Sequence, residues 1–458
     1  MQPAQTLRGV RVTVVGLGIE GVDLVHFLTR EGARVTVSDS RPAERLGSAL
    51  AEIAEDAPEL SLGAQDHPAV TNAEAVFVSQ SVSWHLPALD AARARGVPVS
   101  SMARLFLERC PAPVAGITGS SGKTTTTALT GAILDAAGID HVIGGNIGVG
   151  LLGLLERIGP ATRVVAELSH TQLESVESSP HWACLTNVTP NHLDEFSWDE
   201  YVDLKRRIYA HQRPSDVAVF NLDDPVSRDL MPEAPGTVRA TALETPLSCD
   251  GATLEDGYVV RREGGVTHRV VARAEVSLRG AHNLANVLQA TALASMLGAS
   301  DEAIAAAVRK FNGVPHRLEP VPSNDGLHWV NDSIATTPER TLAGLRSYEE
   351  RVVLLLGGRD KKLPLADLAA EIAHRCRAVV TFGEAGDLFA SAVRTGAPAV
   401  ALERVGTIEE AVRAAARLAR PGDVVLCSPA GTSFDAYPNF ERRGEAFRAA
   451  VSALRGNA

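Results

Sequence analysis

Short apolar runs rich in β-branched residues alternate with longer alanine-rich segments along almost the whole chain. These runs, which we expect to be strands, cover residues 10–15, 34–37, 76–79, 114–118, 163–168, 217–221, 352–356, 378–382 and 424–428. Strands that pair in parallel need crossover connections, and the intervening amphipathic segments have the character of crossover helices. The sequence therefore predicts an α/β protein whose parallel sheets carry helices on both faces.

Breaks in this alternation mark candidate domain boundaries. Pro111 and Pro113 separate the first α/β unit from the second, and the segment FNGVP at residues 311–315 precedes a last α/β unit. A chain of 458 residues is long enough for two to four domains. We therefore predict three domains, over residues 1–111, 112–313 and 314–458.

Charge, hydropathy and cysteine usage exclude several classes of function. The formal net charge of −11 argues against a nucleic-acid-binding surface, which needs clustered basic residues. The apolar runs are too short to span a bilayer, so we expect no membrane insertion. The five cysteines are scattered without CxxC spacing, which is typical of reduced cysteines in a cytoplasmic protein. We expect a cytoplasmic protein with no zinc site.

A glycine-rich loop follows the run at residues 114–118 and precedes a helical segment at residues 125–134. Small residues let backbone N–H groups surround phosphate oxygens, and the following helix adds its positive end. In such a loop the lysine reaches the β- and γ-phosphates, and the next threonine offers its hydroxyl to Mg²⁺. We expect ATP to bind Gly119, Ser120, Ser121, Gly122, Lys123, Thr124 and Thr125, with Thr124 also a metal ligand.

The composition strengthens this interpretation of the loop. The chain has only five lysines against 39 arginines, so a generic positive charge would have been an arginine. The strict pattern GxxxxGK[ST] fails, because Ile117 stands where the first glycine is expected. A glycine and serine turn that contains a lysine by chance is the alternative. The order of strand, loop and helix favours phosphate binding.

Three further residues are candidates for metal chemistry. Glu167 lies at the end of a predicted strand, where a carboxylate suits Mg²⁺; a solvated or capping acid is the alternative. His192 follows another strand-like run, although a lone histidine is more often a packing residue than a ligand. Lys205 flanks the apolar stripe of a helical segment at residues 198–212, where a snorkelling lysine is the alternative.

The first predicted strand leads into a GxGxxG turn at residues 16–21, and Asp39 ends the next strand. This combination is typical of nucleotide binding, and NAD is the obvious ligand to consider. Further along, Asn283 could cap the helix that begins near Gly280, whereas Asn286 falls inside the first turn, where capping does not explain it.

Several segments together resemble the Mur ligases and the folylpolyglutamate synthases, which make amide bonds through an acyl phosphate. They are the loop at residues 118–125, ELSHTQLE from Glu167, GGNIG at residues 144–148, NVTPNHLD from Asn187 and GAHNLAN from Gly280. The amino-terminal turn and NFERRG at residues 439–444 favour the branch that adds glutamate to UDP-N-acetylmuramoyl-L-alanine. The resemblance implies a Rossmann-like N-terminal domain, a central P-loop ATPase-type mononucleotide-binding domain and a Rossmann-like C-terminal domain.

The resemblance also implies ATP and two Mg²⁺ ions. By it, Glu167 is a magnesium ligand and His192 binds the second ion. Lys205 is carbamylated by CO₂, which turns it into an anionic oxygen ligand, a reaction that is open to a lysine amine but not to a guanidinium. The catalytic residues implied are Lys123, Glu167, His192 and Lys205.

The same resemblance assigns substrate contacts in all three domains. The UDP-linked substrate is expected at Ile19, Glu20, Asp39, Ser40, Arg41, Asn146 and His192. Besides the loop, ATP is expected at Asn283, Asn286, Arg317 and Asp332. Glutamate is expected at Thr336, at Lys361 or its neighbour Lys362, and at Ser433 and Phe440. Because these sites lie on different domains, catalysis would require domain closure.

One departure from the family pattern bears on the acceptor. The family's NDSKATN reads NDSIATT at residues 331–337, so Ile334 replaces a lysine. D-glutamate is the family default and a related branch uses L-glutamate, and both stay open. The other candidates are a folylpolyglutamate synthase or different Mur enzyme, an NAD-dependent dehydrogenase and a non-catalytic nucleotide sensor. The resemblance suggests a monomer.

Overall fold

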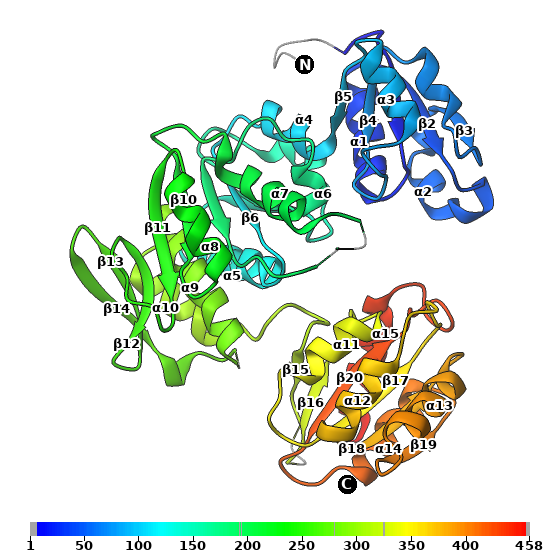
Figure 1. Cartoon of the computed structure of the whole chain (residues 1–458), viewed down its shortest axis with the longest axis vertical. Coiled ribbons are helices and arrows are strands. Elements are labelled where there is room, and N and C mark those ends of the chain that lie inside the picture. The colour runs from blue at the N-terminus through cyan, green and yellow to red at the C-terminus, as the bar shows by residue number, and fades with distance from the viewer. Residues whose placement is uncertain (1–6, 192, 194, 279, 324–325, 455–458) are drawn as a thin grey trace. The chain divides into compact units, whose positions relative to one another are not determined.

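Three β-sheets, each with helices packed on it, form the part of the chain that the structure describes (Figure 1). The structure is a computed structural model that describes residues 7–191, 193, 195–278, 280–323 and 326–454. The chain divides into two compact units. The first, Met1–Phe311, contains two of the sheets, and the second, Asn312–Ala458, contains the third.

The N-terminal sheet has five parallel strands in the order β3-β2-β1-β4-β5. They are β1 (Arg11–Val15), β2 (Arg34–Asp39), β3 (Glu59–Leu62), β4 (Ala75–Val78) and β5 (Val99–Ser101). The helices are α1 (Ile19–Arg30), α2 (Gly47–Glu52), α3 (Pro87–Ala94) and α4 (Met102–Arg109). The strand order reverses between β1 and β4, so the carboxyl end of β1 faces the crevice where ligands bind in such sheets.

The central sheet has nine strands in the order β14-β13-β12-β11-β10-β9-β6-β8-β7. They are β6 (Val114–Thr118), β7 (His141–Gly145), β8 (Arg163–Glu167), β9 (Trp182–Leu185), β10 (Val217–Asn221), β11 (Thr237–Ala242), β12 (Gly251–Glu255), β13 (Tyr258–Glu263) and β14 (Val266–Ala272). The pairs from β7 to β12 are parallel, and β12, β13 and β14 pair antiparallel.

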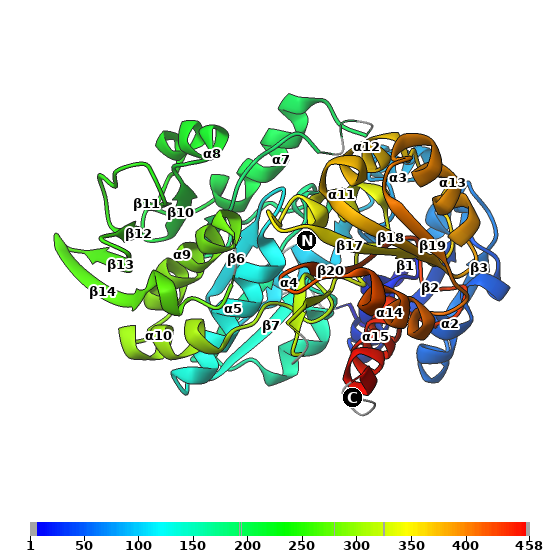
Figure 2. The same cartoon turned by 90° about the horizontal axis from the view of Figure 1, so that it is seen from below.

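Helices cover both faces of the central sheet. They are α5 (Lys123–Ala136), α6 (His170–Leu173), α7 (Trp198–Ala210), α8 (Pro225–Leu230), α9 (Ala281–Met296) and α10 (Asp301–Lys310). Helices α5, α9 and α10 pack together, and Figure 2 shows them grouped away from α7 and α8. The core beneath α5 and α9 contains Ile133 and Val287, whereas α7 contributes Ile208 to a separate core on the other face.

The sheet of the second unit has six strands in the order β15-β16-β20-β17-β18-β19, and all pairs except β15 with β16 are parallel. They are β15 (Glu319–Val321), β16 (His328–Asn331), β17 (Val352–Gly357), β18 (Cys376–Phe382), β19 (Ala401–Arg404) and β20 (Val424–Ala430). The helices are α11 (Pro338–Leu345), α12 (Ala366–Arg375), α13 (Gly386–Gly396), α14 (Ile408–Leu418) and α15 (Phe440–Leu454).

The second unit has one core on each face of its sheet. Leu354 of β17 packs in the core with α11, α12 and α13, whereas the next residue, Leu355, packs in the core with α14 and α15. This alternation follows from strand geometry, in which successive side chains point to opposite faces. Both cores consist of residues from within the second unit.

The N-terminal and central sheets share one core through α4. Leu105 and Phe106 of α4 belong to the same buried cluster as Leu24 of α1 and Leu152, which lies after β7. The three α/β domains of the prediction are confirmed as a fold class, and the structure itself divides the chain at Phe311. The boundaries at residues 111 and 313 stay predictions. Among the described residues, every helix is too short or too polar to cross a membrane.

Candidate active site

The glycine-rich loop connects β6 to α5, and two of its glycines are required by their surroundings. Gly119 has a φ of +151°, and a Cβ there would lie 1.9 Å from the Thr186 hydroxyl. Gly122, the N-cap of α5, has a φ of +81°, and a Cβ there would lie 2.3 Å from the side-chain oxygen of Asn286. Only glycine adopts these angles without strain. The loop is therefore fitted closely between the end of β9 and the start of α9.

Asn187 supports this loop from just beyond β9, where it comes directly after Thr186. Its side-chain oxygen accepts a hydrogen bond from the backbone N–H of Ser121 at 3.0 Å, and its carbonyl accepts one from the N–H of Ser120 at 2.9 Å. The Ser120 hydroxyl donates to the carbonyl of Thr189 at 2.9 Å. The sequence alone assigned no role to Asn187, because this role depends on the pairing of β9 beside β6.

Lys123 lies against its own loop. Its Nζ donates to the carbonyl of Gly119 at 2.7 Å and to that of Ser120 at 3.3 Å. The next two predicted residues, Thr124 and Thr125, lie in the first turn of α5, where Thr124 is half-buried and Thr125 is buried. The predicted phosphate-binding residues thus form one continuous segment, and the ammonium group of Lys123 lies inside the loop. This arrangement suits a phosphate chain.

Glu167 ends β8, directly beside the strand that leads into the loop. In the parallel pairing of β6 with β8, Ile117 is the register partner of Glu167. The Glu167 side chain is fully buried, and its Oε1 accepts a hydrogen bond from Asn146 Nδ2 at 2.7 Å. Among the described residues, its buried Oε2 has no hydrogen-bond partner. A buried carboxylate oxygen without a donor is costly, and a hard cation would satisfy it. Asn146, predicted to contact substrate, therefore also orients the predicted metal ligand.

Lys205 of α7 is buried next to Thr118, at the carboxyl end of β6, with 1% of its surface exposed. Its Nζ donates to Thr118 Oγ1 at 3.3 Å and lies 5.3 Å from the centre of the Tyr201 ring. Burial, followed by repulsion from Lys123, lowers the pKa of Lys205 well below its ordinary value, against the attraction of Glu167. The snorkelling alternative is wrong, because a snorkelling amine lies in water. Burial therefore disfavours the charged form of this amine.

The metal set expected from the sequence is only partly described. His192 lies outside the described residues. Within the described part of the chain, no group of three or more His, Cys, Asp or Glu side chains could hold a metal ion. The predicted ligands that remain are Glu167, with its unpartnered Oε2, the hydroxyl of Thr124, and Lys205. An oxygen on Lys205, as a carbamate would add, fits the donor type that Mg²⁺ requires.

Two of the predicted ATP contacts, Asn283 and Asn286, lie at the start of α9. Asn286 is buried against Gly122 of the loop, and its Nδ2 donates to Asn283 Oδ1 at 3.3 Å. The N-cap of α9 is Gly280, without a side-chain cap, so the prediction that Asn283 caps this helix is wrong. The reason is that the chain already turns at Gly280, which has a φ of +87° and leaves Asn283 inside the first turn.

At the N-terminal sheet, Asp39 and Arg41 form a tight cluster behind the GxGxxG turn. Asp39 Oδ2 accepts the Leu17 N–H at 2.8 Å and Arg41 Nη2 at 2.7 Å. Burial alone would raise the pKa of Asp39, but the hydrogen bonds from Arg41 and Leu17 outweigh it and lower the pKa to about 2. Ser40 is half-buried, and Ile19 is 64% exposed at the start of α1. These four predicted residues therefore share one end of the sheet.

Glu20, which lies in the GxGxxG turn and is also predicted to contact the UDP-linked substrate, is hydrogen-bonded to protein groups. Its two carboxylate oxygens accept hydrogen bonds from Gln172 Nε2 of α6 and from the backbone N–H of Gln80 at 2.8 Å. Burial raises the pKa of Glu20, and the two hydrogen bonds offset part of that rise. The side chain thus joins the N-terminal sheet to the segment that follows Glu167.

In the second unit, Asp332 follows β16 and is buried. Its Oδ2 accepts from Ser428 Oγ at 2.7 Å and its Oδ1 from the Leu318 N–H at 3.2 Å. Burial raises the pKa of Asp332 to about 7, although the hydrogen bonds from Ser428 and Leu318 favour the charged form. Arg317 lies in the turn between His316 and Leu318, both of which have positive φ angles. The structure therefore places two predicted ATP residues on adjoining segments.

The predicted glutamate residues gather at two neighbouring places of the same unit. Lys361 Nζ donates to Thr336 Oγ1 at 3.3 Å, so these two predicted residues are in contact. Lys362 has a φ of +59°, and its backbone N–H donates to Asp360 Oδ1 at 2.9 Å. Of the two neighbouring lysines, Lys361 is therefore the one directed at Thr336.

Arg443 of α15 is a residue that the sequence prediction missed. It is fully buried and donates to the Ser333 hydroxyl at 3.0 Å, to the Ser333 carbonyl at 2.9 Å and to the Gly431 carbonyl at 3.0 Å. The Ser333 hydroxyl in turn donates to the carbonyl of Phe440 at 2.8 Å. Ser433 is buried two residues after Gly431. Arg443 thus ties together the segments that carry Thr336, Ser433 and Phe440.

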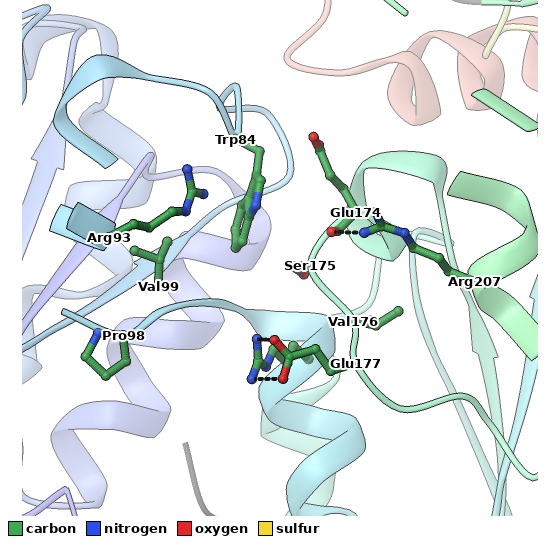
Figure 3. Close-up of a pocket in the computed structure, with 10 residues that line it drawn as sticks. Trp84, Arg93, Pro98, Val99, Glu174, Ser175, Val176, Glu177 and Arg207 are labelled. Atoms are coloured by element: carbon green, nitrogen blue, oxygen red, sulfur yellow. Dashed lines mark hydrogen bonds and ion pairs between the residues drawn. The ribbon is translucent and has the colours of Figure 1, made fainter. Parts of the chain in front are cut away.

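A cavity of about 420 Å³ in the first unit lies apart from these groups. Figure 3 shows Trp84, Arg93, Glu174 and Arg207 around it, with the Arg207 guanidinium bonded to the carbonyl of Glu174. None of the predicted site residues lines this cavity.

Three family models match successive parts of the chain. The Mur ligase MurD-like N-terminal domain matches residues 10–101, the Mur ligase middle domain matches residues 117–294, and the glutamate ligase domain of Mur ligases matches residues 316–431.

Curated relatives match over nearly the whole length. The UDP-N-acetylmuramoylalanine–D-glutamate ligase of Symbiobacterium thermophilum is 41% identical over 446 residues, which cover 97% of this chain and 98% of the relative. The protein of the same name from Anaeromyxobacter dehalogenans is 40% identical over 462 residues, 97% of this chain and 98% of the relative. The crystal structure of UDP-N-acetylmuramate-alanine ligase MurC from Thermotoga maritima has a TM-score of 0.59 at 18% identity, over 98% of this chain and all of that one, and supports the fold alone.

Proposed function

The chain belongs to the Mur ligase family, and on that premise we propose that it is an ATP-dependent ligase joining D-glutamate to UDP-N-acetylmuramoyl-L-alanine. This reaction makes a peptidoglycan precursor. The relatives' names include D-glutamate, which favours it over the L-glutamate alternative. Membership across nearly the whole chain also argues against the NAD-dependent dehydrogenase, which would use the first glycine turn alone.

One observation carries the proposal. The phosphate loop, the buried carboxylate of Glu167 and the buried amine of Lys205 converge at the carboxyl ends of the adjacent strands β6 and β8. Each of the three offers a group that a metal–nucleotide complex can use. The loop holds a cation, Glu167 has an unpartnered oxygen, and Lys205 is buried without a carboxylate in hydrogen-bonding contact among the described residues. A metal–nucleotide complex would satisfy all of them.

In the proposed reaction the alanyl carboxylate of the UDP-linked substrate attacks the γ-phosphate of ATP, giving an acyl phosphate and ADP. The neutral amine of glutamate then displaces phosphate and forms the amide. Lys123 and the N-terminus of α5 offset negative charge on the phosphates, while the braced loop fixes their position. The protein's contribution is mainly positioning and charge neutralisation.

We propose that two Mg²⁺ ions bind to Thr124, Glu167, His192 and a carbamate on Lys205. Bound Mg²⁺ would supply charge neutralisation at the phosphate oxygens. The burial of Lys205 supports carbamylation, because only the neutral amine reacts with CO₂ and burial lowers the pKa of this lysine. Asn146 holds Glu167 in place by its hydrogen bond to Oε1.

The remaining predicted residues are proposed as substrate contacts. Asp39, Ser40, Arg41 and Ile19 would bind the uridine nucleotide, and Asn146 the muramoyl portion. For ATP, the proposed contacts beyond the loop are Asn283, Asn286, Arg317 and Asp332. Thr336, Lys361, Ser433 and Phe440 would hold glutamate. Glu20 is better suited to bracing than to binding, because both of its oxygens already accept protein hydrogen bonds.

Phosphate release from ATP tests the proposal. With UDP-N-acetylmuramoyl-L-alanine present, D-glutamate should stimulate release, whereas L-glutamate and meso-diaminopimelate should not. Stimulation by L-glutamate alone would move the assignment to the L-specific branch. ATP binding without amino-acid-dependent release would favour the nucleotide sensor instead. The monomeric state and the cytoplasmic location expected from the sequence remain predictions, and sedimentation and cell fractionation would test them.

A further inference from the structure

The turn that follows β16 lacks the lysine that the family pattern has at Ile334, and it is closed by its own backbone. The N–H of Ala335 donates to the Asp332 carbonyl at 2.9 Å, and the N–H of Thr336 donates to the Ile334 carbonyl at 2.9 Å. Residues 334 and 336 are therefore held close together, and a side chain that contacts either one reaches the same small region.

Two cations approach this turn. Lys361, which follows β17, donates to the hydroxyl of Thr336 at 3.3 Å. Arg340, in the first turn of α11, donates through Nη1 to the carbonyl of Ile334 at 3.5 Å. Both side chains are exposed, and both use neutral oxygens as acceptors. The position of the missing lysine is thus bordered by an arginine from the next helix.

The side chains that the structure describes, which do not include that of Glu339, place no carboxylate beside this pair of cations. Within the described residues, neither Arg340 nor Lys361 has a carboxylate within ion-pair distance, whereas Arg346 at the other end of α11 pairs with Glu371 at 3.0 Å. Burial, and after it repulsion from Arg340, lowers the pKa of Lys361. The two positive charges therefore lie close enough to repel each other. Two like charges held near one turn favour an anion between them.

We propose that Arg340 is a specificity-determining residue that replaces the missing lysine and, together with Lys361, binds the carboxylates of the amino-acid acceptor. This inference rests on the proposed function and extends it to a residue that the family pattern does not include. A guanidinium suits the role, because its planar fork binds a carboxylate through two parallel hydrogen bonds. Its place near the N-terminus of α11, which is capped by Thr337, adds the positive end of the helix.

The arrangement also explains why the acceptor must be acidic. Arg340 and Lys361 contact residues 334 and 336 of the same turn. An acceptor with two carboxylates can neutralise both cations, whereas its amide analogue leaves one of them unpaired. A site built to bind a second carboxylate therefore rejects an analogue that lacks it.

The test is a comparison of Arg340→Ala, Arg340→Lys and Arg346→Ala with the unaltered full-length enzyme. We expect Arg340→Ala to raise the KM for D-glutamate at least 10-fold and to change the KM for ATP and for the UDP-linked substrate less than threefold. Arg340→Lys should recover part of the loss, and Arg346→Ala should leave all three values unchanged. The preference for D-glutamate over D-glutamine should fall in Arg340→Ala.

A double variant that moves the positive charge from position 340 to position 334 gives an independent test. Adding Ile334→Lys to Arg340→Ala should lower the KM for D-glutamate again, and failure to do so would overturn the claim that the arginine replaces that lysine. An unchanged KM for D-glutamate in Arg340→Ala, or an equal rise in all three KM values, would overturn the proposal. If a variant loses turnover, binding of D-glutamate can be measured instead. The rise in melting temperature that D-glutamate causes in the presence of a non-hydrolysable ATP analogue then compares the variants with the unaltered enzyme. A wild-type enzyme without amino-acid-dependent phosphate release would instead refute the proposed function.

Discussion

The interpretation of Lys205 depends on its surroundings, which the structure shows and the sequence does not. In the sequence it flanks an apolar helix stripe, which is equally compatible with a solvated lysine. The structure buries it beside Thr118, near Glu167 and Lys123, where an ammonium is disfavoured. The resemblance identified the residue, but its burial and its lowered pKa come from contacts between segments far apart in the chain.

The carbamate on Lys205 can be tested directly. Lys205→Ala should lower kcat at least 100-fold, because it removes the proposed metal ligand, which would act in the transition state. Wild-type activity should fall when CO₂ and bicarbonate are removed and return when they are added. Lys310→Ala, on the exposed end of α10, is the matched control and should retain full activity. Full activity of Lys205→Ala without bicarbonate would contradict the assignment, as would the absence of a carbamate signal from ¹³C-bicarbonate by NMR.

Asp332 gives the second unit a predictable pH dependence. Its pKa of about 7 in the folded protein lies above the value of about 3.9 for an unfolded aspartate, so the folded state keeps a proton that the unfolded state has lost. Stability should therefore fall as the pH rises from about 4 to about 7, by at most about 4 kcal/mol at about 1.4 kcal/mol per pKa unit. Urea unfolding at several pH values should show this slope in the wild type, and Asp332→Asn should remove it.

At the scale of elements, much could be predicted because strands and helices follow local patterns. The strands at residues 114–118 and 217–221 match β6 and β10 at both ends, and Asp39 does end β2. Contacts between elements could not be predicted in this way. The cap assigned to Asn283 failed because Gly280 already starts α9, and the roles of Asn187 and Arg443 depend on partners elsewhere in the chain.

The contact between the loop and α9 makes a sharp prediction for Gly122. Gly122→Ala combines a strained φ with a Cβ that would lie 2.3 Å from Asn286, so it should weaken ATP binding at least 10-fold and lower the melting temperature. Gly138→Ala is the matched control: its φ of +65° gives comparable strain, but a Cβ there meets no atom within 4 Å. ATP titration should separate the two variants. Equal ATP affinities would mean that the contact with Asn286 has no role in nucleotide binding.

At the scale of the whole molecule, the distribution of cores determines which parts can stand alone. Both cores of residues 312–458 lie within that unit, so this fragment should fold by itself and unfold cooperatively. Residues 1–111 should not, because Leu105 and Phe106 of α4 would lose Leu152 and the central domain from their shared core. Circular dichroism melts of the two fragments would test this, and a cooperative melt of residues 1–111 would contradict it.

The scarcity of lysine has a practical consequence for chemistry on this protein. An amine-acylating reagent meets only five side-chain targets, and Lys205 is shielded by its burial. Lys310 and Lys362 are exposed and should react whatever is bound, whereas Lys123 and Lys361 lie where nucleotide and acceptor are proposed to bind. Mass spectrometry of the acylated chain would then read out the occupancy of two separate subsites in one experiment, with Lys310 as the internal standard.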